Sequence, residues 1–309
     1  MSNNIKLKKR KDILSLLDFV FALGQSDGKE SYAYAFNQNG GMMTVADCDA
    51  TGTVGELQIS EHASRITAGT MDAMFQLASN REFALTTKTL SSFHEEFEVA
   101  LQKNMVENFE DIPSVSYVTL LMQCEHKEFR TAFLNKGNQK LFFLGKDGLI
   151  LLTPRDGNEP AYGSFFTCPL PGILLCVSNS CFERFEGPMD FEYAVLDALC
   201  DSQTVEGFKS LLTKKITAEG KESFILLAAG FGFGSFKSFS KALSNRKSNL
   251  YWNVLSKETN ATPYEAQAMI NAYNKVYLSY QPDFDEADFA EADVTEADAE
   301  EGDDGNHEE

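Results

Sequence analysis

The order of hydrophobic periodicities along this chain constrains its fold more than any single motif. Apolar alternation predicts strands at 31–36 and 42–46, and a second group of strands follows between 115 and 178. Helical spacing of apolar residues predicts one pair of helices between these groups and another pair after them. Because the strands are grouped and joined mostly by short turns, the sequence favours an α+β protein with antiparallel sheets over alternating βαβ units.

The core of such a protein must be large enough to hold two sheets together. The chain has 309 residues, 43% of them hydrophobic, and 25 Phe. Two stacked sheets between pairs of helices would bury the apolar helix faces and use this Phe content. The predicted helices cover 60–79, 89–109, 191–200 and 204–218. The remaining predicted strands cover 115–123, 130–135, 139–144, 149–153, 172–178 and 223–229.

The N-terminal segment 12–24 is apolar after a basic start. Asp12 and Asp18 interrupt it, and it is too short to span a bilayer, which argues against a signal peptide and a membrane anchor. Its apolar residues recur at helical spacing and predict a helix that packs on the body. These residues are Ile13, Leu16, Leu17, Val20 and Phe21.

The negative charge of the chain is concentrated at its C-terminus. The formal net charge is −19, and residues 283–309 contain 14 Asp or Glu and no Lys or Arg, which leaves −5 for residues 1–282. Nucleic-acid binding is disfavoured because phosphate contacts need clustered cations. The basic residues between 6 and 11 are interpreted as a solvated N-terminal arm.

Composition also suggests three segments and a compartment. We expect a body at 1–234, which includes the N-terminal helix, a helical extension at 235–281, and a disordered acidic tail at 282–309. None of the six Cys forms a CxxC pair, which is typical of a reducing compartment and argues against structural zinc. We therefore expect a cytoplasmic protein that binds neither membrane nor nucleic acid.

Residues 44–56 form the segment with the most chemical information. An apolar run ends at Asp47, a Gly-bearing turn follows, and a long helical pattern begins near Ser60. A carboxylate at the end of a buried strand, with loose backbone behind it, is a common arrangement for binding a hard cation or a phosphate. Asp47 is therefore a candidate ligand whose partners must come from elsewhere in the chain.

Several local motifs, ordered between residues 24 and 230, resemble those of the PP2C (PPM) family of metal-dependent Ser/Thr protein phosphatases. The resemblance implies a four-layer α-β-β-α sandwich of two mainly antiparallel sheets flanked by helix pairs. The segment 235–281 then becomes a C-terminal helical extension. The motifs are Lys29-Glu30-Ser31-Tyr32, Val45 to Gly52, Val118-Thr119-Leu120, Asn135 to Lys140, Asp147 to Thr153, Leu174 to Ser180, and Gly220 to Ser223.

The same resemblance implies a metal site. The family binds two Mg²⁺ or Mn²⁺ ions that bridge the water attacking the phosphorus. Glu30 and Asp47 keep acidic positions of that site, Cys48 replaces a Gly whose carbonyl is a ligand, and Asn179 replaces an Asp. Gly220 stands in place of the last Asp, beside Lys221. The predicted metal-site residues are Glu30, Asp47, Cys48, Asp49 and Asn179.

These departures change the expected function. A site that has lost roughly two negative charges compensates two adjacent dications poorly. We expect one weakly bound Mg²⁺ or Mn²⁺ at most, or none, and little or no turnover. The leading hypothesis is a PP2C-like pseudophosphatase that binds a protein partner, such as a phosphoprotein or a kinase. The alternatives are a divergent Mg/Mn-dependent Ser/Thr phosphatase and a non-enzymatic scaffold or assembly component.

Overall fold

The structure is a computed structural model. It describes residues 13–25, 28–80, 85–125, 128–153, 161–165, 171–218, 223–232 and 234–250, together with residue 268. The acidic tail predicted at 282–309 lies outside the described residues. So does the part of the predicted helical extension beyond 250, apart from residue 268.

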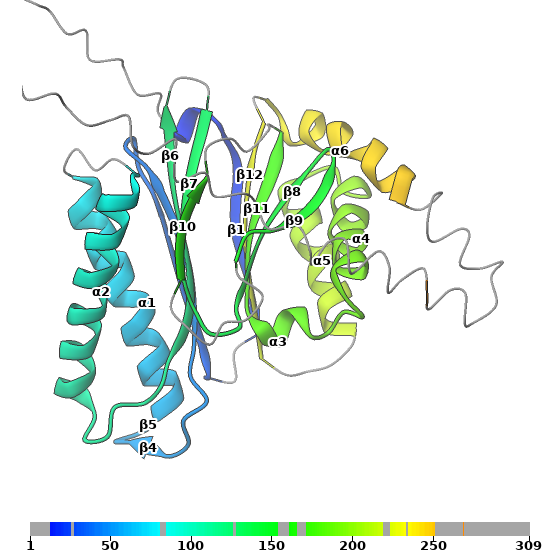
Figure 1. Cartoon of the computed structure of the whole chain (residues 1–309). Coiled ribbons are helices and arrows are strands. Elements are labelled where there is room, and N and C mark those ends of the chain that lie inside the picture. Colours follow the sequence, from blue (N-terminus) through cyan, green and yellow to red (C-terminus); the bar gives the residue numbers. More distant parts are fainter. Residues whose placement is uncertain are drawn as a thin grey trace, which may run out of the picture.

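The described chain forms four layers, with two sheets stacked between two groups of helices (Figure 1). This arrangement confirms the predicted α+β sandwich. One outer layer contains α1 and α2, and the opposite outer layer contains α4, α5 and α6. The helices are α1 (Ile59–Ser79), α2 (Thr87–Asn108), α3 (Asn179–Phe182), α4 (Pro188–Cys200), α5 (Val205–Ala218) and α6 (Phe236–Leu250).

Each of the two large sheets has five strands among the described residues. The first, called the β1 sheet, has the order β1-β12-β11-β8-β9, and the second, called the β2 sheet, has the order β10-β7-β6-β3-β2. The strand pairings described within both sheets are antiparallel, as predicted. The strands of the β1 sheet are β1 (Leu17–Gln25), β12 (Phe224–Phe231), β11 (Gly172–Val177), β8 (Lys140–Gly145) and β9 (Gly148–Leu151). The strands of the β2 sheet are β10 (Ala161–Phe165), β7 (Glu128–Lys136), β6 (Ser116–Glu125), β3 (Gly41–Asp47) and β2 (Glu30–Phe36).

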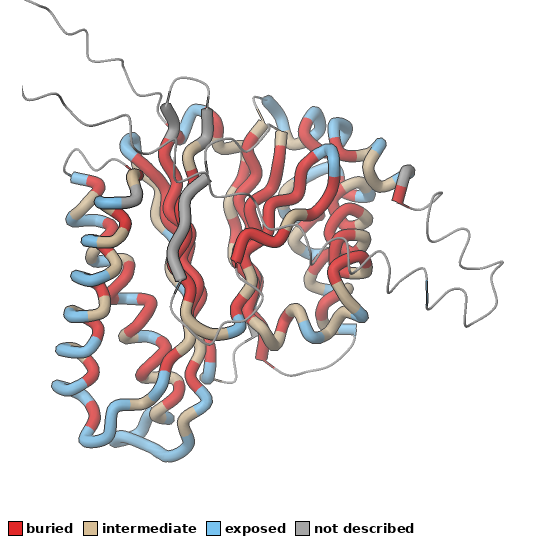
Figure 2. The backbone as a smooth tube through the Cα atoms, in the orientation of Figure 1, coloured by how far each residue is buried: buried red, intermediate tan, exposed pale blue. Residues whose placement is uncertain are grey.

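Three apolar layers hold this sandwich together. The central strands of both sheets are largely buried (Figure 2). One layer lies between the β1 sheet and its helices and includes Phe208. The middle layer lies between the sheets and includes Val45 and Leu227. The third lies between the β2 sheet and α1 and α2, and includes Phe97. Because both faces of each sheet are covered, the central strands read as continuous apolar runs.

The N-terminal helix predicted at 12–24 is wrong. Among the described residues, which begin at Ile13, a short 3₁₀ turn at Ile13–Ser15 precedes β1, and β1 pairs with β12 at the edge of its sheet. Phe19 and Phe21 pack toward the helices, whereas Val20 packs toward the other sheet. A strand buried on both faces has apolar residues at every spacing, so it also satisfies the helical pattern.

Four short elements were not predicted. They are the strand β10, the helix α3, and the strands β4 (Thr53–Val54) and β5 (Leu57–Gln58), which form a small hairpin. A longer helix, α6, begins directly after the boundary drawn at 234, within the segment predicted as a helical extension. It packs on α4 and contributes Phe239, Leu243 and Leu250 to the same apolar layer as α4.

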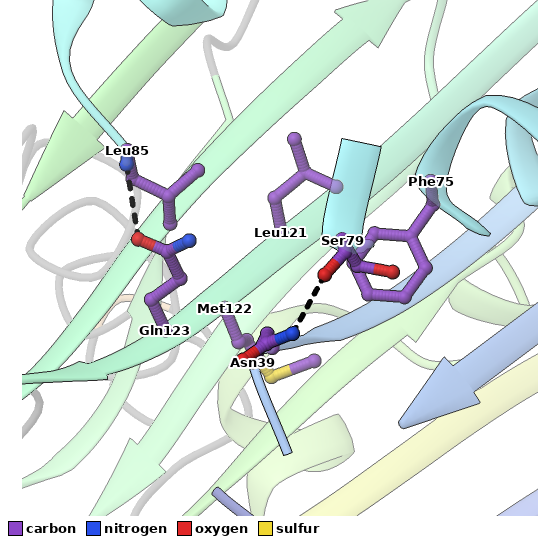
Figure 3. Close-up of a pocket in the computed structure, with 8 residues that line it drawn as sticks. Asn39, Phe75, Ser79, Leu85, Leu121, Met122 and Gln123 are labelled. Atoms are coloured by element: carbon purple, nitrogen blue, oxygen red, sulfur yellow. Dashed lines mark hydrogen bonds between the residues drawn. The ribbon is translucent and has the colours of Figure 1, made fainter. Parts of the chain in front are cut away.

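The hairpin turn between β2 and β3 sets the register of these two strands. The Asn37 side chain accepts hydrogen bonds from the backbone N–H groups of Asn39 and Gly40, at 2.9 and 3.1 Å. The Asn39 amide donates to the Ser79 carbonyl at the end of α1, at 2.7 Å (Figure 3). Because the turn is held in this way, Phe36 pairs with Gly41 and, at the opposite end, Glu30 pairs with Asp47.

None of the helices in the described part of the chain is both long and apolar enough to cross a membrane.

Candidate functional site

Glu30 and Asp47 meet at the end of the β2–β3 hairpin opposite its turn. Glu30 begins β2, Asp47 ends β3, and the two residues are direct partners across the strands. Glu30 is buried, with 6% of its surface exposed, and Asp47 is half-buried. The structure therefore brings together the two acids for which the sequence predicted a shared role.

Two serines from the other sheet hold the Glu30 carboxylate. The Ser180 hydroxyl donates to Glu30 Oε1, and the Ser223 hydroxyl donates to Oε2 at 3.2 Å. Ser180 lies in α3, directly after β11, and Ser223 directly precedes β12. Each oxygen of this carboxylate thus accepts a hydrogen bond from the rim of the β1 sheet. The sequence motifs contain both serines, but they gave no signal of this role.

The Ser178 side chain positions the loop that carries Ser180. Its hydroxyl oxygen accepts a hydrogen bond from the backbone N–H of Cys181 at 3.3 Å and caps α3. It also accepts from the Ile225 N–H on β12 at 3.0 Å, and it lies 3.0 Å from the Ser180 hydroxyl. Because Ser178 is fully buried, this network fixes α3 against the end of the β1 sheet.

Asp47 lies in an environment that opposes its charge. Burial, followed by the negative charges of Asp49 and Glu30, raises the pKa of the Asp47 carboxyl to about 6. Asp49 is exposed in the turn that follows. Near neutral pH the site therefore contains a carboxylate that a bound cation would stabilise.

The side chains of Cys48 and Asn179 make contacts of their own. The Cys48 backbone N–H donates to the Lys29 carbonyl at 3.2 Å, and its side chain packs in the apolar layer beside α1. The Asn179 amide donates to Oε1 of Glu183, the residue that caps the end of α3, at 2.8 Å. Gly220 and Lys221 lie outside the described residues.

These residues fit a two-metal centre poorly. Hard divalent cations require several anionic oxygens directed at one point. Among the described residues, no three His, Cys, Asp or Glu side chains are grouped closely enough to hold a metal ion. The Glu30 oxygens accept hydrogen bonds from Ser180 and Ser223, and the neutral Asn179 amide contacts its own helix. The donor set that remains is Asp47, with Asp49 near it in the following turn.

An open cleft of about 320 Å³ adjoins Glu30. Its walls come from β1, β2, β12 and the first turns of α1. Arg65 on α1 lines it and forms an ion pair with Glu61, with Nη2 and Oε1 2.6 Å apart. The cleft therefore connects the carboxylate site to the outer edge of the β2 sheet.

Comparison with solved structures identifies the class of fold. A bacterial serine phosphatase with a single arginine substitution matches with a TM-score of 0.52 and 13% identity, over 69% of this chain and 99% of that chain. A sex-determining protein of C. elegans matches with a TM-score of 0.56 and 10% identity, over 73% and 67% of the two chains. The PP2C phosphatase domain of SpoIIE from Bacillus subtilis matches with a TM-score of 0.49 and 10% identity, over 71% and 65%.

The chain thus has the PP2C-type phosphatase fold, as its motifs predicted, in a strongly diverged form. No known family profile and no curated protein sequence matches the chain. At these identities the likeness establishes the architecture, and the function must be argued from the site.

Proposed function

We propose that this protein is a PP2C-like pseudophosphatase that acts by binding a protein partner. The observation that carries the proposal is the Glu30 carboxylate, whose two oxygens accept hydrogen bonds from Ser180 and Ser223. A metal ligand must direct a lone pair at the cation, and each of these serine hydrogen bonds competes for one oxygen. In this chain the acid links the two sheets by hydrogen bonds.

Charge counting supports the same proposal. Two adjacent dications repel each other strongly unless several carboxylates compensate them. Asn179 contributes no charge, and its amide donates to Glu183. Asp47 and Asp49 alone would hold at most one weakly bound Mg²⁺ or Mn²⁺. One ion can polarise a phosphate, but it cannot also supply the bridged hydroxide of a two-metal mechanism.

A phosphatase assay tests the proposal directly. The purified full chain, supplied with millimolar Mn²⁺ and p-nitrophenyl phosphate, should show no turnover above that of Asp47→Ala. Asp72→Ala, an acid-to-alanine change on α1, serves as the matched control. Turnover that disappears in Asp47→Ala and persists in Asp72→Ala would refute the pseudophosphatase assignment.

One observation favours the second candidate, a divergent Mg/Mn-dependent Ser/Thr phosphatase. The charge of Asp49 contributes to the raised pKa of Asp47, so the two carboxylates are close enough to interact. Together with Glu30 and Asn179 they would have to rebuild the site around a cation. Metal analysis of the purified protein distinguishes the two candidates, because this one requires stoichiometric Mn²⁺ or Mg²⁺ bound through Asp47.

The third candidate is a scaffold or assembly component that makes contacts through 235–281 and the acidic tail. Truncation after residue 281, followed by capture of bound proteins, tests it. Loss of all binding upon truncation would favour the scaffold, whereas retention would assign binding to residues 1–281.

A further inference from the structure

The outer edge of β2 is regular, and no described strand pairs with it. Among the strands that the structure describes, β2 pairs with β3 alone. Its seven residues, Glu30–Phe36, pair in continuous register, and the strand contains no Lys, Pro or bulge. An edge of this kind presents a row of backbone donors and acceptors to any extended chain that approaches it.

The other edges of the two sheets are less suited to accept a strand. β9 has four residues, and β10 has five and includes Gly163. β1 has a register shift between Leu17 and Phe19, and it carries Asp18 at that shift. Short length, glycine, irregularity and charge are the means by which proteins protect sheet edges. β2 has none of these except the acid at its first residue.

The surface beside β2 combines apolar and aromatic groups. Ala22, Gly24 and Ile225 line the cleft of about 320 Å³ at the start of the strand. The rings of Tyr32 and Tyr34 are stacked, with centroids 6.4 Å apart, and the two residues are 43% and 42% exposed. An exposed pair of aligned tyrosines offers a rigid apolar platform with polar tips, as is common where proteins bind one another.

The charges of the cleft select for a cation. Glu30 and Glu61 line it, and Asp47 lies directly opposite Glu30. Arg65 is the lining cation among the described residues, and it pairs with Glu61. The cleft therefore has a net negative charge, which attracts Lys or Arg and repels phosphate.

We propose that the edge of β2 binds an extended, basic segment of a partner protein. The segment adds as a further strand, packs alternate apolar side chains on Tyr32 and Tyr34, and places a Lys or Arg in the cleft near Glu61. This inference rests on the proposed binding function and names the chemistry of the partner. A phosphorylated segment is the wrong ligand for this surface.

The terminal segments of this chain are poorer occupants. The acidic tail carries the same sign of charge as the cleft. The basic residues Lys6 to Lys11 precede Ile13, which lies at the far end of β1 from the cleft. Leu17 and Gly24 are about 23 Å apart along an extended strand. Even in a fully extended chain, Lys11 lies at most about 7 Å from Ile13, and Lys6 at most about 24 Å. Most of this basic cluster is therefore too close to Ile13 to cover the length of β1 and reach the cleft.

A peptide-binding experiment with the full chain tests the proposal. The probe is a fluorescein-labelled nonapeptide of alternating Lys and Val, followed by fluorescence anisotropy at physiological salt. We expect saturable binding that is at least about tenfold tighter than that of the matched Glu–Val peptide. N-methylation of alternate backbone amides should weaken binding about tenfold, because it removes the donors of the added strand. Hydrogen exchange should slow at 30–36 upon binding and remain unchanged at 148–151.

Matched variants separate the cleft from the overall charge of the protein. Glu61→Lys should weaken the Lys–Val peptide about tenfold, whereas Glu107→Lys, the same charge change at an exposed position of α2, should alter it less than about twofold. Equal effects of the two variants would overturn the proposal. A tenfold gain of affinity upon deletion of residues 1–12 would also overturn it, because it would identify the N-terminal segment as the occupant of the edge. A dimer in solution that Tyr34→Lys dissociates would do the same, because it would identify a second copy of this chain as the occupant.

The phosphatase assay on the same preparation keeps the two proposals distinguishable. Absence of peptide binding together with absence of turnover refutes the basic-segment inference and leaves the pseudophosphatase assignment intact. Manganese-dependent turnover together with peptide binding refutes the pseudophosphatase assignment and supports the basic-segment inference.

Discussion

Removal of the Arg246 side chain should destabilise the protein strongly. Glu192 on α4 has a fully buried side chain, and Arg246 on α6 binds both of its oxygens, with Nε–Oε1 at 2.6 Å and Nη2–Oε2 at 3.0 Å. Arg246→Met keeps most of the volume and leaves a buried carboxylate without its cation. Breaking a buried pair in this way costs about 3–5 kcal/mol of unfolding free energy. For a domain of this size, that corresponds to a fall in Tm of roughly 6–20 °C.

The pH dependence of this variant has a definite sign. Burial raises the pKa of Glu192, and the hydrogen bonds and charge of Arg246 oppose that rise. A carboxyl group whose folded pKa exceeds its unfolded value contributes stability at low pH, and this contribution is lost as pH rises through the folded pKa. Without Arg246 the folded pKa rises further. The loss of stability should therefore be larger at pH 8 than at pH 5, as measured by urea denaturation.

Two controls identify the cause of the loss. Glu192→Gln in the Arg246→Met background should recover most of the stability, because a neutral amide needs no counter-charge. Lys209→Ala, which removes a cation from an exposed pair with Glu206, should cost less than about 0.5 kcal/mol. An Arg246→Met protein that loses less than about 1 kcal/mol would mean that α6 is not docked on α4 in solution, and the reasoning would fail.

Three further perturbations test the site and the backbone around it. The pKa of Asp47 is raised to about 6, so its contribution to wild-type stability falls as pH rises through that value. In urea melts, the unfolding free energy of Asp47→Asn relative to the wild type should therefore increase by up to about 2 kcal/mol between pH 5 and pH 8. Ser223→Ala should cost about 1–3 kcal/mol, since it leaves Glu30 Oε2 without this donor; a loss below about 0.5 kcal/mol in the same melts would speak against the link. Gly137→Ala should lower the Tm by several degrees because Gly137 has φ of 95° and its Cβ would collide with Ser116, whereas Gly69→Ala in the middle of α1 should raise it slightly; equal shifts would contradict the backbone geometry.

Periodicity predicted α1, α2, α4, α5 and the central strands to within a few residues. The predicted helix 60–79 is Ile59–Ser79, and the predicted strand 172–178 is Gly172–Val177. These elements are long or strongly apolar, so one interpretation dominates. The segment 17–25 was misassigned because a strand buried on both faces has no polar side to reveal its period. β10 was missed because five residues with a central glycine are too few for a pattern.

The site could be predicted only where its residues are close in sequence. Glu30 and Asp47 belong to one hairpin, so strand pairing alone brings them together. The Ser180 and Ser223 bonds join residues 150 and 193 positions from Glu30, and they depend on how the two sheets stack. Local pattern contains no such information. A motif comparison located both segments, but it could not show that serine hydroxyls are directed at the carboxylate.

The same two bonds connect the two sheets at the rim where the family resemblance implies a metal site. In a two-metal centre, cations can join carboxylates from both sheets and so stabilise the rim of the sandwich as well as the chemistry. Here Glu30 belongs to the β2 sheet, and both of its serine donors belong to the rim of the β1 sheet. Neutral hydroxyls thus provide a cross-sheet connection that needs no metal ion. The Glu30 bonds hold the rim whether or not a cation binds at Asp47, so the neutral Asn179 leaves this connection intact.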